Sequence, residues 1–137
     1  MNHYSIVSFM PLMAPGIDPG IARRTVESMK GTRHCFEAND HLLPSYDHHD
    51  ENFNPRKYWR GPVWINTDWL LYRGCRATGH HREADELREA IVNLVGTLGF
   101  REYYDPHAAE AYGAHRFSWT AALAIDVIGD EAPEASP

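Results

Sequence analysis

The chain has 137 residues, about the length of one domain, and its 43% hydrophobic and 23% charged residues are ordinary proportions for a globular protein. The formal net charge of -6 argues against a nucleic-acid backbone as the main partner, because such a partner requires a basic face. No stretch reaches the ~18 apolar residues of a membrane span, so no membrane partner is expected.

Two cysteines, Cys35 and Cys75, exclude a secreted scaffold held by several disulfides, although one disulfide is possible. The first residues lack the basic and apolar regions of a signal peptide. We therefore expect two reduced thiols and a cytoplasmic location.

The chain begins with an apolar segment, residues 4–14, which is predicted to be buried and to be broken at Pro11. Because a domain seldom opens on a core element, this segment indicates that the chain starts within a larger fold. A first helix is predicted over residues 19–30, with Asp18 as its N-cap and Gly31 as its stop. Its apolar residues fall on one side, which is typical of an outer helix.

A long irregular connection follows over residues 32–57, and loops of this length tend to be functional or disordered. Its apolar part, residues 42–46, is expected to be an ordered loop packed on the surface. A second helix is predicted over residues 62–78, opened by Pro62. It is apolar on nearly all sides and is therefore expected to be buried, and Gly74 within it would permit close packing.

The clearest amphipathic pattern covers residues 81–98 and predicts a third helix that ends at Gly99. Residues 100–113 are read as another connection. A fourth helix, residues 117–128, is again apolar on nearly all sides, with Ser118 as a possible N-cap. The last residues, 130–137, are too polar to pack and are expected to form a disordered tail after a single folded portion, residues 1–129.

One-sided and all-apolar helices thus alternate along the chain. This alternation predicts an all-α fold in which outer and inner helices form a double ring, an α/α barrel or toroid. The loops 32–61 and 99–116, which both precede an inner helix, would lie on the same rim. Four helices do not close such a ring, so the chain either oligomerises or forms part of a longer one.

Glu102 is the first candidate for acid–base chemistry, because it stands among aromatic residues on the second rim loop. Aromatic walls remove a carboxylate from water, which would raise its pKa and suit it to general acid or base work near neutral pH. The alternative is an ordinary solvent-exposed glutamate. Sequence spacing alone cannot choose a partner for it among the other nearby carboxylates, Asp47, Asp50, Asp68, Asp105 and Glu110.

A second candidate is the aromatic and basic run that contains Tyr58, Trp59, Arg60 and Trp64. Stacking rings beside a guanidinium fork would suit a polyhydroxylated ring. Alternatively, both tryptophans are core residues and Arg60 forms a structural ion pair. The run His48-His49-Asp50 is only a weak metal signal, because zinc spacings such as His-Glu-x-x-His are absent, and neither a metal nor a cofactor is expected.

Three motifs follow one another along the chain: residues 58–66 (Tyr-Trp-Arg-Gly-Pro-Val-Trp-Ile-Asn), 99–106 (Gly-Phe-Arg-Glu-Tyr-Tyr-Asp-Pro) and 117–123 (Phe-Ser-Trp-Thr-Ala-Ala-Leu). These motifs resemble the C-terminal part of glycoside hydrolase family 63 and the mannosylglycerate-hydrolase-like group, which is related to the family 37 trehalases. They occur in the family's order and at similar spacing, and the resemblance covers residues 4–128.

The resemblance implies an (α/α)6 barrel that hydrolyses glycosidic bonds with inversion. It implies a small carbohydrate as substrate and is compatible with an α-glucoside, a mannosylglycerate-type solute or a trehalose-like sugar. It places the general base on Glu102. It places substrate contacts on residues of all three motifs and the connection between them: Tyr58, Trp59, Arg60, Gly61, Trp64, Glu110 and Trp119.

The general acid of this group is an Asp upstream of anything in this chain, and the resemblance assigns that role to none of its aspartates. The chain also reads Ala109-Glu110-Ala111 where the family usually has Gly-Glu-Gly. The N-terminal half of the barrel is therefore expected as a partner. The alternatives are a truncated non-catalytic fragment and a helical interaction module without hydrolase activity of its own.

Overall fold

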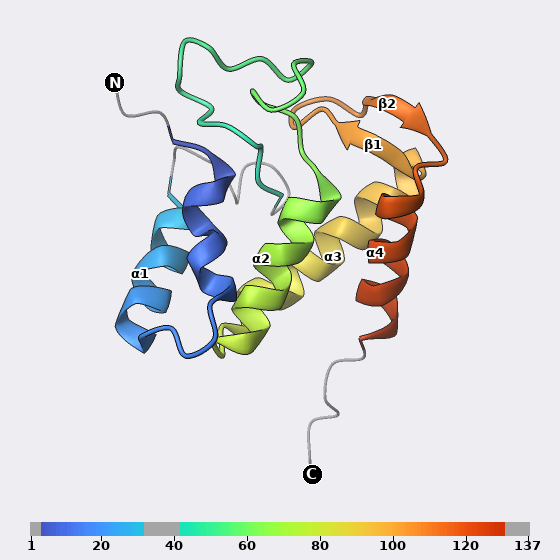
Figure 1. Ribbon diagram of the computed structural model, residues 1–137. Helices are drawn as coiled ribbons and strands as arrows, with labels where there is room; N and C mark the ends of the chain where they lie inside the picture. Colours follow the sequence, from blue (N-terminus) through green and yellow to red (C-terminus); the bar gives the residue numbers. More distant parts are fainter. Residues whose placement is uncertain (1–3, 32–41, 131–137) are drawn as a thin grey trace.

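The computed structural model describes residues 4–31 and 42–130. It contains a 3-10 helix, η1 (Ile6–Met13), four α-helices and one antiparallel hairpin, β1 (Arg101–Tyr104) with β2 (Ala111–His115). The α-helices are α1 (Pro19–Met29), α2 (Ile65–Ala77), α3 (His81–Leu98) and α4 (Ser118–Gly129). Figure 1 shows the helices as one layered body, with the segment before α2 and the hairpin lying together at one end. We call that end the rim.

The first helix begins as predicted. The side chain of Asp18 accepts a hydrogen bond from the Ile21 N–H at 3.0 Å, which satisfies one of the free donors at the start of α1. The buried side of α1 consists of Ala22, Val26 and Met29, while Ile21 is exposed. The one-sided pattern predicted for this helix is confirmed.

The apolar start of the chain differs from its prediction, because the helix η1 continues through Pro11 to Met13. A 3-10 helix has three residues per turn, so positions three apart share a face. Ile6, Phe9 and Leu12 accordingly point into the core, whereas Val7 remains 65% exposed. The segment is buried on one face only.

Helix α2 packs against η1, α3 and α4 and is the centre of the core. Leu71, Tyr72 and Cys75 are fully buried, and Gly74 lies so close to η1 that an added Cβ would be 2.7 Å from the Cβ of Leu12. The close packing expected at Gly74 is confirmed. Burial raises the pKa of the free Cys75 thiol to about 12, as expected for a reduced cysteine inside a core, while Cys35 lies outside the described residues.

Helix α2 starts later than its sequence pattern predicts, since Pro62 and Val63 are not helical. Val63 is extended and bridges two other segments, Pro44 on one side and Tyr104 on the other. Its N–H donates to the Tyr104 carbonyl at 2.9 Å, and the Tyr104 N–H donates back at 3.0 Å. Both hydrogen-bonding groups of the Val63 backbone therefore pair with Tyr104 at the rim, and α2 begins only at Ile65.

Helix α3 matches its prediction and buries Ala84, Leu87, Ile91 and Val95 against the core. The following residues do not form a simple connection, because they build the hairpin β1–β2. Two short runs of aromatic and small residues flank the turn former Asp105-Pro106, which is a typical hairpin signal that the helical interpretation overlooked.

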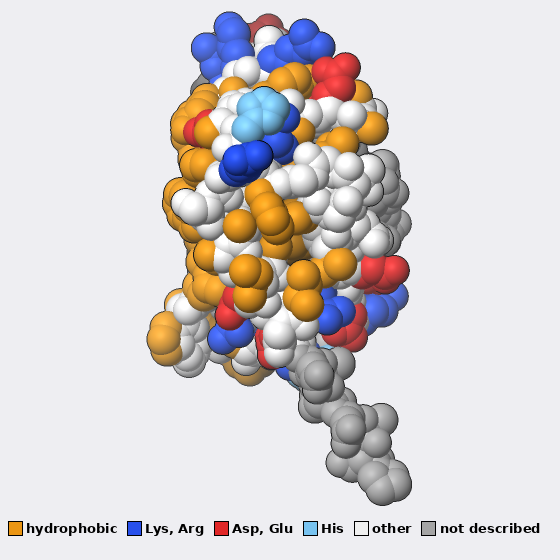
Figure 2. Space-filling model, turned by 90° about the vertical axis from the view of Figure 1, so that its right-hand side faces the viewer, with side chains coloured by type: hydrophobic (Ala, Val, Ile, Leu, Met, Phe, Trp, Pro, Cys, Tyr) orange, Lys and Arg blue, Asp and Glu red, His pale blue; other side chains and the backbone are white. Residues whose placement is uncertain are grey.

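Helix α4 is as apolar as predicted but only half covered. Thr120, Ala124 and Val127 are buried, while Trp119, Ile125 and Ile128 are between 52% and 67% exposed. Figure 2 shows hydrophobic side chains gathered along this side of the molecule, over α4. Ser118 is the first helical residue, and the N-cap position is taken by Phe117 without a side-chain cap.

The polar end of α4 is anchored, contrary to the expectation that residue 130 begins a loose tail. The Tyr72 hydroxyl donates a hydrogen bond to Asp130, and the Arg73 and Arg76 guanidinium groups lie 3.5 and 4.0 Å from its carboxylate. Residues 131–137, the rest of the predicted tail, lie outside the described residues. No described helix is long and apolar enough to cross a membrane.

Candidate functional site

Four rings form one contiguous group at the rim: Tyr58, Trp59, Trp64 and Tyr103. We call this group the aromatic cluster. Trp64 lies in the middle, stacked on Trp59 with ring centroids 4.5 Å apart and on Tyr103 at 5.1 Å. Tyr58 meets Trp64 edge-on at 4.7 Å and Tyr103 at 5.4 Å.

The two tryptophans have different environments. Trp64 is 3% exposed and its indole N–H donates to the Tyr58 carbonyl at 2.7 Å, so it is a satisfied core residue. Trp59 stacks on it but remains 48% exposed, which leaves ring surface open to solvent. Trp64 is therefore the buried ring on which the others pack, and Trp59 and Tyr58 present the accessible aromatic surface.

Glu102 lies against this cluster. The Tyr58 hydroxyl donates to its Oε1 at 2.6 Å, and the backbone N–H of Ala114 donates to its Oε2 at 2.9 Å. These two hydrogen bonds, the one from Tyr58 first, hold the pKa of Glu102 below its ordinary value and outweigh the opposing effect of burial. The raised pKa expected from the aromatic surroundings is wrong, because Glu102 lies at the solvent-exposed edge of the rings with both oxygens bonded.

The close approach of the hairpin to Glu102 depends on Gly113. Its φ of +70° is a left-handed conformation that favours glycine. A Cβ added there would lie 2.4 Å from Oε2 of Glu102 and 2.9 Å from the Tyr103 ring. Neither Gly113 nor the Ala114 N–H was singled out from the sequence, because their role depends on a strand pairing that was not predicted.

The rim segments are tied together by backbone contacts. Pro44 and Tyr104 bridge to Val63 from opposite sides, and the Ser45 hydroxyl accepts from the Gly61 N–H at 3.2 Å. Gly61 is buried, and a Cβ there would lie 2.8 Å from the backbone of Asn54. Residues 42–46 are therefore more buried than the surface loop predicted for them: Leu43 is fully buried and Ser45 is 2% exposed.

Glu110 lies in the hairpin loop, directly before β2, in a polar group of its own. Its Oε2 is 3.2 Å from the Arg56 guanidinium and 2.8 Å from the Tyr112 hydroxyl, which is also 2.9 Å from Asp105. Burial first, and then the two carboxylates, raise the pKa of Tyr112 to about 12. Glu110 therefore joins the loop before the cluster to the hairpin, and its carboxylate is engaged in this structure.

Two other predicted site residues are exposed and lie apart from these contacts. Arg60 is held through its backbone, which donates to Lys57 at 2.7 Å and accepts from Asn54 at 2.6 Å. Trp119, at the start of α4, contacts Phe117 at 6.5 Å between ring centroids. The structure therefore brings Tyr58, Trp59, Trp64 and Glu102 together, and it does not join Arg60 or Trp119 to them through described side-chain contacts.

Asp68, one of the carboxylates expected on or near the rim, lies beneath it. It is fully buried in the first turn of α2 and accepts a hydrogen bond from the Leu43 N–H at 3.0 Å. Within residues 4–31 and 42–130 its second oxygen has no hydrogen-bond partner. Burial raises its pKa well above the ordinary value. Asp47 is also buried and accepts from the His49 N–H at 2.9 Å.

The histidines form a ring contact between the two rim loops. His48 lies edge-on to His107 at 4.6 Å and to Phe53 at 5.1 Å. Burial, with its histidine neighbours, lowers the pKa of His48. In the described part of the chain no group of three or more His, Cys, Asp or Glu side chains could hold a metal ion.

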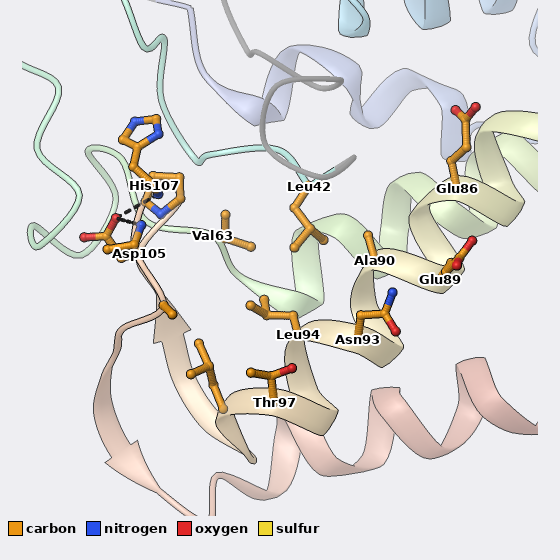
Figure 3. A pocket seen from close by; sticks show the side chains of 14 residues that line it. Leu42, Val63, Glu86, Glu89, Ala90, Asn93, Leu94, Thr97, Asp105 and His107 are labelled. Carbon is orange, nitrogen blue, oxygen red and sulfur yellow. Dashed lines mark hydrogen bonds between the residues drawn. The ribbon is translucent and has the colours of Figure 1, made fainter.

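A pocket of about 670 Å³ lies beside the rim but does not include the aromatic cluster (Figure 3). It opens between α3 and the hairpin turn. The residues that line it include Leu42, Glu89, Asn93, Leu94, Asp105 and His107. Because Glu102, Tyr58 and Trp59 are absent from its walls, this pocket is not the site indicated by the sequence.

The aromatic cluster and Glu102 together offer a carboxylate with remaining acceptor capacity beside exposed rings. A carboxylate has about four acceptor positions, and the two hydrogen bonds leave room for a water molecule. The open faces of Trp59 and Tyr58 suit the apolar face of a sugar ring. The aromatic cluster and its surroundings thus contain one candidate acid–base group, Glu102.

Comparison with known proteins gives the family. The model of the "Mannosylglycerate hydrolase MGH1-like glycoside hydrolase domain" matches residues 1–120. Mannosylglycerate hydrolase of Rubrobacter radiotolerans is 52% identical over 86 residues, which are 63% of this chain and 20% of that protein. The enzyme of the same name from Thermus thermophilus is 40% identical over 117 residues, 85% of this chain and 28% of that protein.

A crystal structure agrees with this assignment. A GH63 mannosylglycerate hydrolase from Thermus thermophilus in complex with Tris superposes with a TM-score of 0.81 at 38% identity, covering 90% of this chain and 29% of that chain. The expected fold, part of a helical barrel, is confirmed, with the small hairpin as an addition. The chain spans between a fifth and three-tenths of these relatives, and it belongs to the family of MGH1-like glycoside hydrolase domains within GH63.

Proposed function

We propose that this chain contributes the general base and part of the sugar site of an inverting glycoside hydrolase. The observation that carries the proposal is the contact between Glu102 and Tyr58 at the edge of the aromatic cluster. These two residues belong to different sequence motifs of the family, and they meet across the rim.

The protonation state of Glu102 supports the role of base. A general base must be ionised to take a proton from water, and the lowered pKa of Glu102 keeps it ionised at neutral pH. In an inverting enzyme the base activates a water while a carboxylic acid, roughly 6.5–9.5 Å away, protonates the leaving oxygen. Asp68, buried beneath the rim, is unsuited to that second role. The family resemblance places the acid on an Asp outside this chain.

The substrate proposed is a small glycoside of the mannosylglycerate type, the compound in the names of the relatives. Trp59 and Tyr58 would stack on its sugar ring, with Trp64 as support. Contacts from Arg60, Gly61, Glu110 and Trp119 remain part of the proposal. To contact a sugar, the Glu110 carboxylate would have to break its ion pair with Arg56 or bind the sugar together with Arg56.

The partner proposed is the remainder of the catalytic barrel, either on the same polypeptide or on another. The exposed apolar side of α4 favours this partner, because an inner helix of a closed ring would be covered there. A cytoplasmic location, as expected from the sequence, is also part of the proposal.

A chimera tests the assignment. The corresponding segment of the Thermus thermophilus enzyme is replaced by this chain, and release of mannose from mannosylglycerate is measured. We expect hydrolysis with inversion. The Glu102→Gln chimera should lose roughly 10²–10⁴-fold in kcat, the usual contribution of acid–base catalysis, with little change in KM.

The Asp105→Asn chimera is the matched control, since Asp105 is a carboxylate of the same hairpin but is not the proposed base. It should retain most of the turnover. Near-normal turnover of the Glu102→Gln chimera would contradict the proposal. A folded but inactive parent chimera would instead favour a non-catalytic fragment.

A further inference from the structure

Within the described residues, Glu102 is held by one side chain, that of Tyr58. The Tyr58 hydroxyl lies 2.6 Å from Oε1, a short distance for a hydroxyl that donates to an ionised acceptor. Tyr58 comes from the segment before α2 and Glu102 from β1, so this hydrogen bond joins two parts of the chain that are distant in sequence.

Tyr58 itself is fixed by its neighbours. Its carbonyl accepts from the Trp64 indole at 2.7 Å, and its ring is bordered by Trp59, Trp64 and Tyr103 at 6.0, 4.7 and 5.4 Å. All three rings meet it edge-on. Tyr58 is 50% exposed, but the three neighbouring rings restrict how far its ring can swing. These contacts therefore favour the observed position of its hydroxyl before any ligand arrives.

Glu102 is fixed from its other side by the hairpin. The Ala114 N–H donates to Oε2 at 2.9 Å, and Gly113 leaves the space that this approach requires. Each oxygen of the carboxylate therefore accepts one hydrogen bond, Oε1 from the Tyr58 hydroxyl of the aromatic cluster and Oε2 from the Ala114 N–H of β2.

We infer that Tyr58 is a positioning residue for Glu102, which fixes the orientation of the carboxylate through its hydroxyl rather than acting on substrate alone. The inference rests on the proposed function only in naming Glu102 as the base. Tyr58 suits the task because it donates without charge, and Glu102 and burial raise the pKa of its own hydroxyl. It therefore remains protonated at the pH at which Glu102 loses its proton and throughout the neutral range.

The first test is a pH titration of the 137-residue chain by NMR, with ¹³C in the glutamate carboxyl groups. Tyr58→Phe removes only the hydroxyl, so we expect a measurable upward shift in the pKa of Glu102, because the ionised form loses its strongest donor. Tyr103→Phe is the matched control. In the part of the chain that the structure describes, the Tyr103 hydroxyl makes no hydrogen bond, and its removal should leave the titration of Glu102 unchanged.

A reciprocal measurement keeps the inference testable if the Tyr58→Phe variant fails to fold. Glu102→Gln should lower the pKa of Tyr58 toward that of an ordinary tyrosine, as followed with ¹³C at the phenol carbon. The inference is overturned if Glu102 titrates identically with and without the Tyr58 hydroxyl. It is equally overturned if Tyr58 titrates identically in the parent chain and in the Glu102→Gln variant.

Catalysis in the chimera adds a readout that a purely structural role would not change. Tyr58→Phe should reduce kcat by up to about 10²-fold with little change in KM, and the acid limb of kcat/KM should move to higher pH. An unmoved limb would overturn the positioning role. The two proposals can fail separately. If Tyr58 and Glu102 do not affect each other's pKa, the positioning role fails but Glu102 can still be the base. If the chimera is inactive, the proposed function fails but the mutual pKa effect measured in the 137-residue chain still stands.

Discussion

At the scale of single residues, the site depends on positions that carry no acid–base chemistry. Gly113 combines a left-handed backbone with the absence of a Cβ beside Glu102. Glu102 and the aromatic residues could be proposed as candidates from the sequence, because their residue types suggest a chemistry and they stand in the motifs that resemble the family. Gly113 and Ala114 could not, since each acts through backbone geometry that only the folded hairpin defines.

Gly113→Ala should displace Glu102 as well as strain the hairpin. We expect a loss of about 1–3 kcal/mol in the free energy of unfolding from the backbone conformation and the collision with Oε2. Chemical denaturation gives the stability, and the carboxyl ¹³C signal reports the displacement. Gly99→Ala is the control, because Gly99 has a φ of +76° with nothing within 4 Å of an added Cβ. Equal shifts of the Glu102 signal in both variants would contradict the steric explanation.

Asp68 should make the stability of the chain depend on pH. Its raised pKa means that the folded chain holds the proton more tightly than the unfolded chain. The free energy of unfolding should therefore fall as the pH rises above about 4, the ordinary pKa of an aspartate, toward the raised value.

Asp68→Asn keeps an acceptor for the Leu43 N–H and removes the charge, so this variant should be at least as stable near neutral pH and should lack that decline. Asp68→Ala leaves the donor unsatisfied and should lose about 1–3 kcal/mol. Urea denaturation across the pH range measures both effects. A large loss for Asp68→Asn at neutral pH would mean that the carboxylate has a charged partner.

At the scale of elements, the helices followed from local patterns, and the deviations occur where distant segments meet. Helices α1, α3 and α4 were predicted nearly to their ends from capping residues and apolar periodicity. Helix α2 starts late because Val63 pairs with Pro44 and Tyr104, and neither partner is adjacent in sequence. The hairpin was missed for a different reason: its strands are short, and the local turn signal at Asp105-Pro106 was interpreted as part of a connection.

The contact between α2 and η1 gives a prediction at this scale. Gly74→Ala improves helix propensity, yet the new Cβ would lie 2.7 Å from Leu12. We expect overpacking to prevail and to reduce stability by about 1–3 kcal/mol. Gly96→Ala in α3 makes the same change where nothing lies within 4 Å, and it should stabilise the chain by roughly 0.5–1 kcal/mol. Thermal unfolding of both variants would reveal the opposite signs, and two stabilised variants would contradict the close packing.

At the scale of the whole molecule, one side of the core is left uncovered. The buried side of α4 packs against α2 and α3, and its other side presents Trp119, Ile125 and Ile128 to solvent. The alternation of one-sided and all-apolar helices predicted this partial ring, because a helix that is apolar all round needs neighbours on every side. The sequence could not reveal which of its faces the chain itself covers.

Ile125→Glu should reduce binding of a dye that reports apolar surface, and should reduce self-association in sedimentation experiments. Stability should change by no more than about 0.5 kcal/mol, since Ile125 is 67% exposed. Val7→Glu is the control, with a similar exposed fraction of 65% on η1. If both variants reduce dye binding equally, the apolar surface is diffuse and α4 is not a specific interface.

The bridging role of Val63 also bears on the order in which the molecule opens. Contacts of α2 with α3 join neighbours in sequence, whereas the bridges from Val63 to Pro44 and Tyr104 close long loops and are favoured only after the helices have assembled. The backbone amides of Val63 and Tyr104 should therefore exchange with deuterium sooner than those of Leu71 or Ile91. The rim would then be the last part of the molecule to form and the first to unfold, while the helical core remains intact.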